Sequence, residues 1–239
     1  MTPLAGPDPG CVHVWTASVI VLRARMPEIR AILSDDERAR ADRYRFEADR
    51  ARFTVGRGLV REFLGRYFGR DGKLIDIRQG AAGKPVAAEA MPFNVSHSGD
   101  LVLLAFASER QVGIDVEEVR RSLEPLDLAP HFFSAAEVAA LAALDGDERM
   151  LAFFRCWTRK EAYLKGTGSG LSRPLHDFDV SLDVGCTSAL RRVAWDAREV
   201  GRWQLRDLEV RPGYAAAVAI EGRGAELHQF TAPSAPFAA

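Results

Sequence analysis

A glutamate interrupts the apolar side of a predicted helix in the second half of this sequence. At 100° per residue, one apolar stripe is formed by Met150, Phe154, Trp157 and Leu164. Glu161 falls in the middle of that stripe, and Lys165 lies one turn further along it. A carboxylate on a buried face is costly unless it is paired or binds a metal ion. The alternative is a solvated i,i+4 pair, which stabilises a helix by only ~0.2–0.5 kcal/mol and belongs on its polar face.

Two more carboxylates share one side of a predicted strand. In the segment Val112–Glu117 (VGIDVE), the apolar side chains alternate with Asp115 and Glu117. Two carboxylates on one face repel each other, and an oxygen-seeking cation such as Mg²⁺ relieves that repulsion. Taken alone, the pair is more typical of two solvated acids at the end of an edge strand. Together with Glu161, it predicts three ligands of a magnesium site.

Cationic and donor groups occur in two further motifs. The strand-like segment Phe93–Ser98 (FNVSHS) ends in Ser96 and His97, which could contact a phosphate, although a lone histidine is more often structural. The turn Gly83-Lys84-Pro85 presents a lysine but lacks the pattern of a Walker loop. The chain has only 4 lysines beside 28 arginines, and three of them lie in these motifs or beside Glu161. Such selective use of lysine indicates sites that need a compact ammonium group.

Composition excludes several classes of protein. The 239 residues are 47% hydrophobic and 27% charged, as in globular proteins, and no apolar run approaches the ~20 residues that span a bilayer. The net charge of −1 disfavours a nucleic-acid or membrane-surface binder. Three scattered cysteines disfavour a disulfide framework and a structural zinc site. Because residues 1–10 carry no basic group, they do not resemble a secretory signal, and we expect the cytoplasm.

Charge is unevenly distributed along the chain. Between Arg23 and Arg70 there are 13 arginines against 8 acidic residues, so the rest of the chain is acidic. This pattern indicates either an anionic ligand of the N-terminal region or a solvated helix face.

Strands and long helices alternate twice, which predicts an α+β fold of two similar lobes. We expect one long helix from about 34 to 68, a hairpin formed by 101–107 and 112–116, and a second helical region from 134 to 165 that is interrupted near 145–146. Strands should return at 178–182, 203–210 and 214–220. The expected divisions are a flexible N-terminus (1–10), an N-terminal lobe (11–110), a C-terminal lobe (111–230) and a flexible tail (231–239).

In this order and spacing, the motifs resemble those of the 4′-phosphopantetheinyl transferases, in particular the larger, monomeric type that activates surfactin synthetase. The likeness spans roughly residues 35–170 and rests on GKP (83–85), FNVSHS (93–98), VGIDVE (112–117), FFS (132–134) and WTRKEAYLK (157–165). The resemblance implies transfer of the phosphopantetheine arm of coenzyme A (CoA) to a serine of an apo carrier protein, with release of 3′,5′-ADP. It also implies a monomer with CoA in a cleft between the two lobes.

The same resemblance implies roles for individual residues. Asp115, Glu117 and Glu161 would hold Mg²⁺ against the CoA pyrophosphate, and Glu161, directly or through a metal-bound water, would take the proton of the carrier serine. Phosphate contacts would come from Lys84, Ser96, His97 and Lys165. Of these, Lys165 and His97 would also be catalytic, Lys165 by neutralising the leaving group.

The family pattern is altered where the CoA 3′-phosphate would bind. Two basic residues are expected early in the first long helix, but Glu37 stands at the first position and Arg40 at the second. Arg38 and Arg52 are the further candidates. The carrier would dock on residues 120–133, where Arg120 and Arg121 could attract an acidic partner. Two other functions stay open: a Mg²⁺-dependent phosphohydrolase or nucleotidyl transferase, and a non-catalytic CoA-binding protein.

Overall fold

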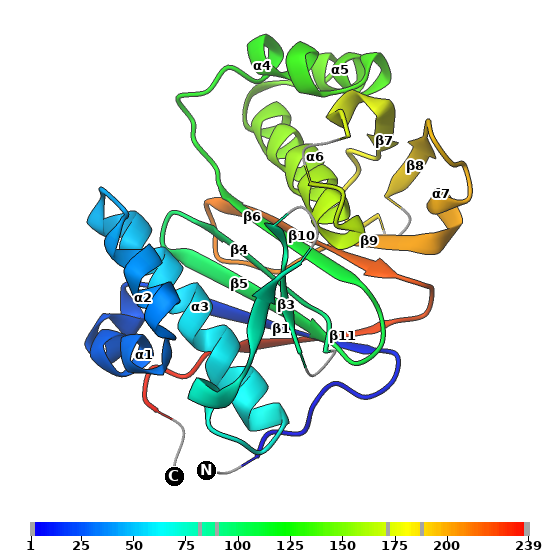
Figure 1. Ribbon diagram of the computed structural model, residues 1–239. Coiled ribbons are helices and arrows are strands. Elements are labelled where there is room, and N and C mark those ends of the chain that lie inside the picture. The colour runs from blue at the N-terminus through cyan, green and yellow to red at the C-terminus, as the bar shows by residue number, and fades with distance from the viewer. Residues whose placement is uncertain (1–2, 81–82, 89–90, 171–172, 187–188, 237–239) are drawn as a thin grey trace. The chain divides into compact units, whose positions relative to one another are not determined.

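The computed structural model describes residues 3–80, 83–88, 91–170, 173–186 and 189–236 (Figure 1). Its residues form two compact units. The first comprises Met1–Gly80, Pro85–Glu109 and Glu226–Ala239, and the second comprises Ala81–Lys84 and Arg110–Ala225. Each unit contains a sheet with one long helix packed on it, so the expected α+β fold of two similar lobes is confirmed.

The first unit is built on a four-stranded sheet of order β11-β1-β5-β4. The sheet consists of β1 (Cys11–Ser18), β4 (Phe93–Ser98), β5 (Leu101–Ala107) and β11 (Glu226–Thr231). In the same unit, β2 (Ile77–Gln79) and β3 (Pro85–Ala87) pair in a separate two-stranded sheet. Its helices are η1 (Val21–Arg25), α1 (Met26–Ile32), α2 (Asp35–Asp42), α3 (Glu47–Tyr67) and η2 (Gly72–Leu74). The apolar side of α3 packs on this sheet, where Phe63 stacks on Trp15 with ring centroids 4.3 Å apart.

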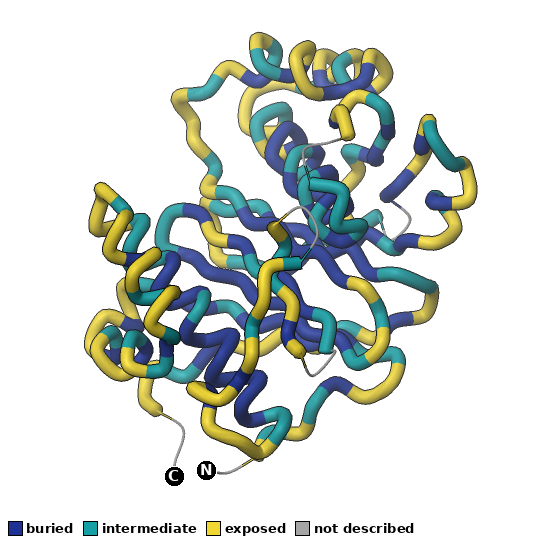
Figure 2. The backbone as a smooth tube through the Cα atoms, in the orientation of Figure 1, coloured by how far each residue is buried: buried dark blue, intermediate teal, exposed yellow. Residues whose placement is uncertain are grey.

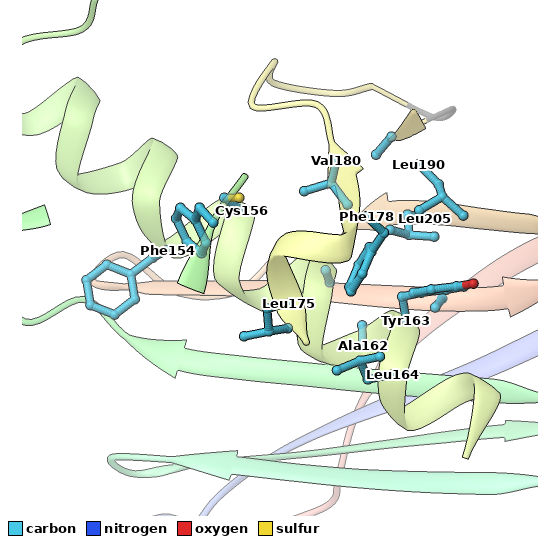
Figure 3. Close-up of a cluster of buried hydrophobic side chains, with 14 of the residues drawn as sticks. Phe154, Cys156, Ala162, Tyr163, Leu164, Leu175, Phe178, Val180, Leu190 and Leu205 are labelled. Atoms are coloured by element: carbon cyan, nitrogen blue, oxygen red, sulfur yellow. The ribbon is translucent and has the colours of Figure 1, made fainter. Parts of the chain in front are cut away.

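The second unit places its longest helix on a three-stranded sheet of order β6-β10-β9. The sheet consists of β6 (Val112–Glu118), β9 (Trp203–Asp207) and β10 (Tyr214–Glu221). In the same unit, β7 (Phe178–Val180) and β8 (Leu190–Val193) pair in a separate two-stranded sheet. Its helices are α4 (Pro125–Phe132), α5 (Ala135–Ala142), α6 (Gly146–Thr167), η5 (Leu175–Asp177) and α7 (Glu199–Arg202). The core includes Tyr163 and Leu164 of α6 together with Phe178 and Leu205 (Figure 3).

Each of the two long helices, α3 and α6, forms an ion pair with the capping-box glutamate of the helix before it. Ser34 caps α2 in a reciprocal capping box with Glu37, and Ser134 caps α5 in the same way with Glu137. Each glutamate also reaches a cation on the long helix that follows. Glu37 contacts the Arg61 guanidinium of α3 at 2.5 Å, and Glu137 contacts the Lys160 ammonium of α6 at 2.8 Å. The two units therefore share the same side-chain contacts between a capping glutamate and the long helix, in addition to a similar order of elements.

The single long helix expected from 34 to 68 is wrong. The chain leaves the helix after Asp42 and starts α3 at Glu47, with Phe46 in an extended conformation. Glu37 and Arg61 are 24 residues apart and would be ~36 Å apart in one straight helix. Their ion pair and the capping box of Ser34 instead fold α2 back on α3.

The expected hairpin of 101–107 and 112–116 is also wrong. Strand β5 is buried along its whole length and pairs with β1 and β4 on its two sides, which leaves no edge for β6. Strand β6 pairs with β10 in the second unit instead. The intervening polar residues carry the chain from one unit to the other.

The C-terminal boundary of the lobes also differs from the expectation. Residues 226–231 form β11, which pairs in parallel with β1 and so belongs to the first unit. Five of the six residues of this strand are exposed, and its side chains therefore show no apolar alternation that would predict a strand (Figure 2). Of the termini expected to be flexible, residues 1–2 and 237–239 lie outside the described part of the chain. None of the described helices combines the length and hydropathy needed to cross a bilayer.

Candidate active site

Two glycines let helix α6 approach strand β6 unusually closely. A Cβ atom on Gly113 would lie 2.1 Å from the Ala162 carbonyl oxygen and 2.2 Å from the Gly166 nitrogen. On the helix side, a Cβ atom on Gly166 would lie 2.7 Å from the Trp203 ring. The approach of α6 to β6 therefore requires glycine at 113, and the packing of α6 on Trp203 of β9 requires glycine at 166. The approach at Gly113 brings the side of α6 that carries Glu161 and Lys165 onto the side of β6 that carries Asp115.

The three predicted carboxylates belong to these two facing elements. Asp115 is only 3% exposed in the middle of β6, Glu117 is half-buried two residues later, and Glu161 is half-buried on α6. Burial raises the pKa of the Glu161 carboxyl, and the negative charges of Asp115 and Glu117 raise it further, against the opposing effect of Lys165. The three carboxylates are thus close enough to influence one another.

Two lysines bind to these facing elements, Lys165 through a carboxylate and Lys84 through the backbone. The Lys165 ammonium donates to Asp115 Oδ1 at 2.6 Å. The Lys84 ammonium donates to the carbonyl oxygens of Val112 at 3.1 Å and Gly166 at 3.4 Å, at the point where β6 begins and α6 ends. Burial lowers the pKa of Lys84 to about 8. An ammonium has three donors, and the described residues occupy two of those of Lys84, which leaves one for a ligand as far as the described part of the chain is concerned.

The donor set fits a hard divalent cation. Carboxylate oxygens are the ligands that Mg²⁺ prefers, and a cation would offset the mutual repulsion that raises the pKa of Glu161. Asp115, Glu117 and Glu161 could hold such an ion. Lys165 adds a fixed positive charge beside it, as binding of a pyrophosphate requires.

Lys160 has a structural role that its sequence context did not reveal. Its side chain is fully buried and forms an ion pair with Glu137 at 2.8 Å. It also donates to the carbonyl oxygens of Leu175 and Phe178. All three donors are used, so Lys160 holds η5 and α5 to helix α6 and has no donor left for a ligand.

The first unit contains a basic pocket of its own. The side chains of Arg40, Arg52, Arg57 and His97 line it together with Tyr44, Phe53, Gly56, Val60, Pro85 and Val95. Arg40 lies over the Phe53 ring, with 5.1 Å between its guanidinium carbon and the ring centroid. Arg52 is held by Asp49 and by the Gly99 carbonyl oxygen. These arginines are thus oriented by neighbours, which favours binding of an anion such as a phosphate.

Two predicted phosphate-binding residues do not line this pocket. Arg38 forms an ion pair with Asp35 and donates to the Leu33 carbonyl oxygen, at the start of α2. Ser96 is buried, and strand alternation directs it to the face of β4 opposite to that of Val95 and His97. Glu37, at the position where the family has a basic residue, is engaged by its cap and by Arg57 and Arg61.

Arg57 was not predicted, although the sequence contains a signal for it. On α3 it follows Phe53 by four residues and precedes Val60 by three, so it is the charged residue on an otherwise apolar stripe. Burial lowers the pKa of its guanidinium, while Glu37 at 3.4 Å opposes that effect. The same reasoning that singled out Glu161 would have found it.

An apolar groove lies along the segment expected to dock a carrier. Arg120 and the exposed ring of Phe132 line it with Glu117, Leu123, Leu128, Phe153, Phe154 and Trp157. The Phe132 ring meets Trp157 edge-on at 5.2 Å. Within the expected segment, residues 125–132 form helix α4, for which Pro125 and Pro130 in the sequence are poor indicators. Arg121 forms a bidentate pair with Asp147, so Arg120 is the arginine that faces the groove.

Comparison with known proteins identifies the family. A family model described as the 4′-phosphopantetheinyl transferase superfamily matches residues 111–219, and one described as 4′-phosphopantetheinyl transferase, N-terminal, matches residues 22–109. The 4′-phosphopantetheinyl transferase HetI of Nostoc sp. strain PCC 7120 is 35% identical over 218 residues, which cover 89% of each chain. The chain belongs to the 4′-phosphopantetheinyl transferases. The expected family is thereby confirmed.

Two further transferases of this family align over most of their length. The 4′-phosphopantetheinyl transferase Sfp of Bacillus subtilis strain 168 is 35% identical over 190 residues, covering 79% of this chain and 82% of Sfp. The 4′-phosphopantetheinyl transferase psf-1 of Bacillus pumilus is 32% identical over 210 residues, covering 86% of both chains. The expected activity of this phosphopantetheinyl transferase, with CoA as substrate and carrier proteins as acceptors, is confirmed by this membership.

Proposed function

We propose that this phosphopantetheinyl transferase carries out its reaction with the facing side chains of β6 and α6, with Mg²⁺ as the metal ion. The observation that supports this best is the cluster of Asp115, Glu161 and Lys165 on two elements held together by Gly113. Such an arrangement of carboxylates beside an ammonium suits a pyrophosphate and its counterion. A site of this kind can bind the pyrophosphate of CoA while the phosphopantetheine group is transferred.

Glu161 is the base for the acceptor serine. Its carboxylate is half-buried on α6 beside Asp115 and Lys165, where it can accept the hydroxyl proton. As Glu161 takes the hydroxyl proton, the serine oxygen bonds to the CoA β-phosphorus and the bond to the bridging oxygen breaks. The 3′,5′-ADP leaves with the electron pair of that bond. Lys165 neutralises the charge that develops on this product.

The metal ion has a limited part in this scheme. When bound by Asp115, Glu117 and Glu161, Mg²⁺ would supply charge neutralisation to the pyrophosphate. Lys84 directs its remaining donor to the phosphates, since its other two are held by carbonyl oxygens.

The basic pocket of the first unit binds a phosphate group of CoA. Arg40 and Arg52 with His97 are the predicted residues that line it, and Arg57 adds a third guanidinium. Guanidinium groups form paired hydrogen bonds with phosphate oxygens, so a cluster of three favours a phosphate with two charges. We assign the 3′-phosphate of CoA to this pocket and leave Arg38 outside it.

The carrier docks on the groove beside α4. Its apolar lining at Leu128, Phe132 and Trp157 suits the apolar side of a partner helix. Arg120 at the rim would attract an acidic carrier and speed its approach. Glu117 lines the same groove, so a docked carrier lies next to one of the proposed metal ligands.

The magnesium site is tested by metal dependence in paired variants. Transfer to an apo carrier is measured against Mg²⁺ concentration for the unchanged protein, Glu117→Gln and the adjacent Glu118→Gln. We expect Glu117→Gln to raise the half-saturating Mg²⁺ concentration at least ~10-fold, because it removes a charged ligand. Glu118→Gln, on the opposite side of the strand, should change it little. Transfer that persists undiminished in EDTA would contradict the proposal.

The docking groove is tested by separating the two substrates. Trp157→Ala should raise the KM for the carrier and leave the KM for CoA unchanged, because it removes apolar surface from the groove alone. Leu151→Ala removes an exposed leucine of the same helix outside the groove and is the matched control. Equal effects of the two variants on the carrier KM would rule out docking at this surface.

We also propose a monomer that acts in the cytoplasm. The motifs that resemble those of the larger, monomeric family type support the monomer. Light scattering on the purified protein tests the monomer, and cell fractionation tests the location.

A further inference from the structure

A second cluster of metal-binding side chains lies on the sheet of the first unit. Strands β1 and β11 are parallel neighbours, and Cys11 is the register partner of Glu226 (Figure 1). His228 follows Glu226 by two residues and therefore lies on the same face of β11. Ligand atoms of Cys11, Glu226 and His228 all lie within 4.8 Å of one another. None of the three residues belongs to the transfer site proposed above.

The distances are close to those of a coordination shell. Cys11 Sγ lies 3.9 Å from Glu226 Oε2, and His228 Nε2 lies 3.7 Å from the same oxygen atom. In a tetrahedral zinc site, ligand atoms are roughly 3.3–3.6 Å apart, given zinc bonds of 2.0–2.3 Å. Small side-chain rotations would therefore bring all three atoms to one ion. Glu226 and His228 are exposed, so an ion can reach them.

The types of ligand select a class of ion. A thiolate, an imidazole and a carboxylate together suit Zn²⁺ or a similar borderline-soft ion, whereas Mg²⁺ prefers oxygen ligands alone. The sequence predicted no zinc site because it contains no C-x-x-C pair. This cluster joins residues 215 positions apart in the chain, which only the pairing of β1 with β11 brings together.

Neighbouring side chains support one face of the cluster. His13 is the register partner of His228, and their rings stack with centroids 5.8 Å apart. His13 is also fixed by the Tyr67 hydroxyl, 3.1 Å from its Nδ1 atom. The His228 ring is thus packed on a held neighbour, which lowers the cost of orienting it toward an ion.

We propose that Cys11, Glu226 and His228 bind a Zn²⁺-like divalent ion, with water in the fourth position, and that this ion fastens β11 to β1. Strand β11 is at the edge of its sheet and pairs with β1 alone. An ion that binds the folded unit but not the unfolded chain stabilises it by mass action. The ion therefore sets how firmly the last strand of the first unit is held.

Cobalt is the probe, because its spectrum reports thiolate ligation. The metal-free full-length protein is titrated with Co²⁺ in excess Mg²⁺, which occupies the carboxylate site. We expect about one equivalent of Co²⁺ to bind with a near-ultraviolet thiolate-to-cobalt absorption band, which Zn²⁺ then displaces. Cobalt bound only by carboxylates would lack this band.

Variants assign the band to its ligands. Cys11→Ser should abolish it, and Glu226→Gln and His228→Ala should each weaken Co²⁺ binding about 10-fold or more. Cys186→Ser and His176→Ala are the controls for another partly exposed thiol and another exposed imidazole, and should leave the band intact. Transferase activity in excess Mg²⁺ confirms that each variant is folded.

Two results would overturn the proposal. One is the absence of a thiolate band in the unchanged protein at saturating Co²⁺, which would mean that the three side chains interact only by hydrogen bonds and charge. The other is a band that persists in Cys11→Ser, which would place the thiolate ligand elsewhere. A rise in melting temperature with Zn²⁺ that is lost in Glu226→Gln would add support for the fastening of β11.

Discussion

The role proposed for Glu161 places two requirements on its surroundings. It must be half-buried to have a raised pKa, and it must remain within the field of Asp115 and Lys165. The apolar stripe of α6 predicted the first of these from sequence. The second depends on Gly113, because only a backbone without a Cβ atom lets β6 lie so close to the helix.

Changing Glu161 to glutamine should therefore remove catalysis without unfolding the protein. Loss of a general base costs ~10²–10⁴-fold in rate, so kcat should fall by this amount. Glu148→Gln, an exposed change on the same helix, is the control and should leave kcat unchanged. Steady-state transfer to a carrier gives the rates, and circular dichroism checks the fold. An active Glu161→Gln variant would refute the assignment of the base.

Lys160 and Lys165 are five residues apart on one helix and should fail in different ways. Lys160→Met leaves Glu137 buried beside an uncharged neighbour, which costs about 3–5 kcal/mol of unfolding free energy. Lys165→Met should lower kcat by ~10²–10³-fold, because it removes a charge-stabilising donor. Urea denaturation and transfer rates measured on both variants separate the two roles. A large loss of stability in Lys165→Met with normal kcat would reverse the assignment.

Lys84 should give the enzyme a pH-dependent affinity for CoA. Its pKa is lowered to about 8, so the ammonium loses its charge as the pH rises through 8, and the KM for CoA should increase. Lys84→Arg keeps the charge and should move this increase to higher pH. Lys73→Arg, an exposed change, is the control. An unchanged pH profile of KM in Lys84→Arg would exclude Lys84 as a phosphate ligand.

The same pKa predicts the opposite trend for stability. Burial lowers the pKa of Lys84 to about 8 in the folded protein, whereas in the unfolded chain it has the ordinary lysine pKa of 10.5. Between these values the unfolded state binds more protons, so this group adds stability as the pH rises. Affinity for CoA should therefore fall while the contribution of Lys84 to the unfolding free energy grows.

At the scale of elements, local signals were predictable and partner choice was not. The capping boxes at Ser34 and Ser134 and the break before Gly146 can be read from short stretches of sequence. The pairing of β5 and β6 cannot, because two adjacent strands with a polar turn between them satisfy the hairpin pattern. What decides the outcome is that β1 and β4 occupy both edges of β5.

The end of helix α2 also could not be predicted from local sequence. The segment from 35 to 50 has few apolar residues, so its periodicity does not show where the helix should end. The turn after Asp42 is instead determined by Glu37, which meets Arg57 and Arg61 of α3 at long range in sequence. The glutamate that interrupts the family pattern is therefore explained by packing.

Gly113 gives the element-scale test. In Gly113→Ala the new methyl group would meet the backbone of α6, which cannot move without disturbing Glu161 and Lys165. Overpacking of this kind costs about 1–3 kcal/mol, and the rate of transfer should fall as well. Gly201→Ala has open space around its Cβ position, with the nearest atom 3.6 Å away, and is the control. Thermal unfolding and kcat of both variants test the contact. Wild-type stability and kcat in Gly113→Ala would show that the close approach is not needed.

At the scale of the whole molecule, the two family models leave β1 and β11 entirely outside their matches. Because these strands pair with each other, the first unit depends on residues from both ends of the described chain. The sequence motifs identified the transferase from residues 83–165 alone. The role of β11 could not be predicted in that way, since its mostly exposed side chains carry no apolar pattern.

The central claim is transfer of phosphopantetheine to a carrier serine by the carboxylates of β6 and α6. Its most direct test is the intact mass of an apo carrier protein after incubation with CoA, Mg²⁺ and this enzyme. The predicted result is a mass gain of one phosphopantetheine, which EDTA, Glu161→Gln or alanine at the acceptor serine abolishes. A carrier of unchanged mass with hydrolysed CoA would indicate a phosphohydrolase, and one with intact, bound CoA a binding protein. Either result would contradict the claim.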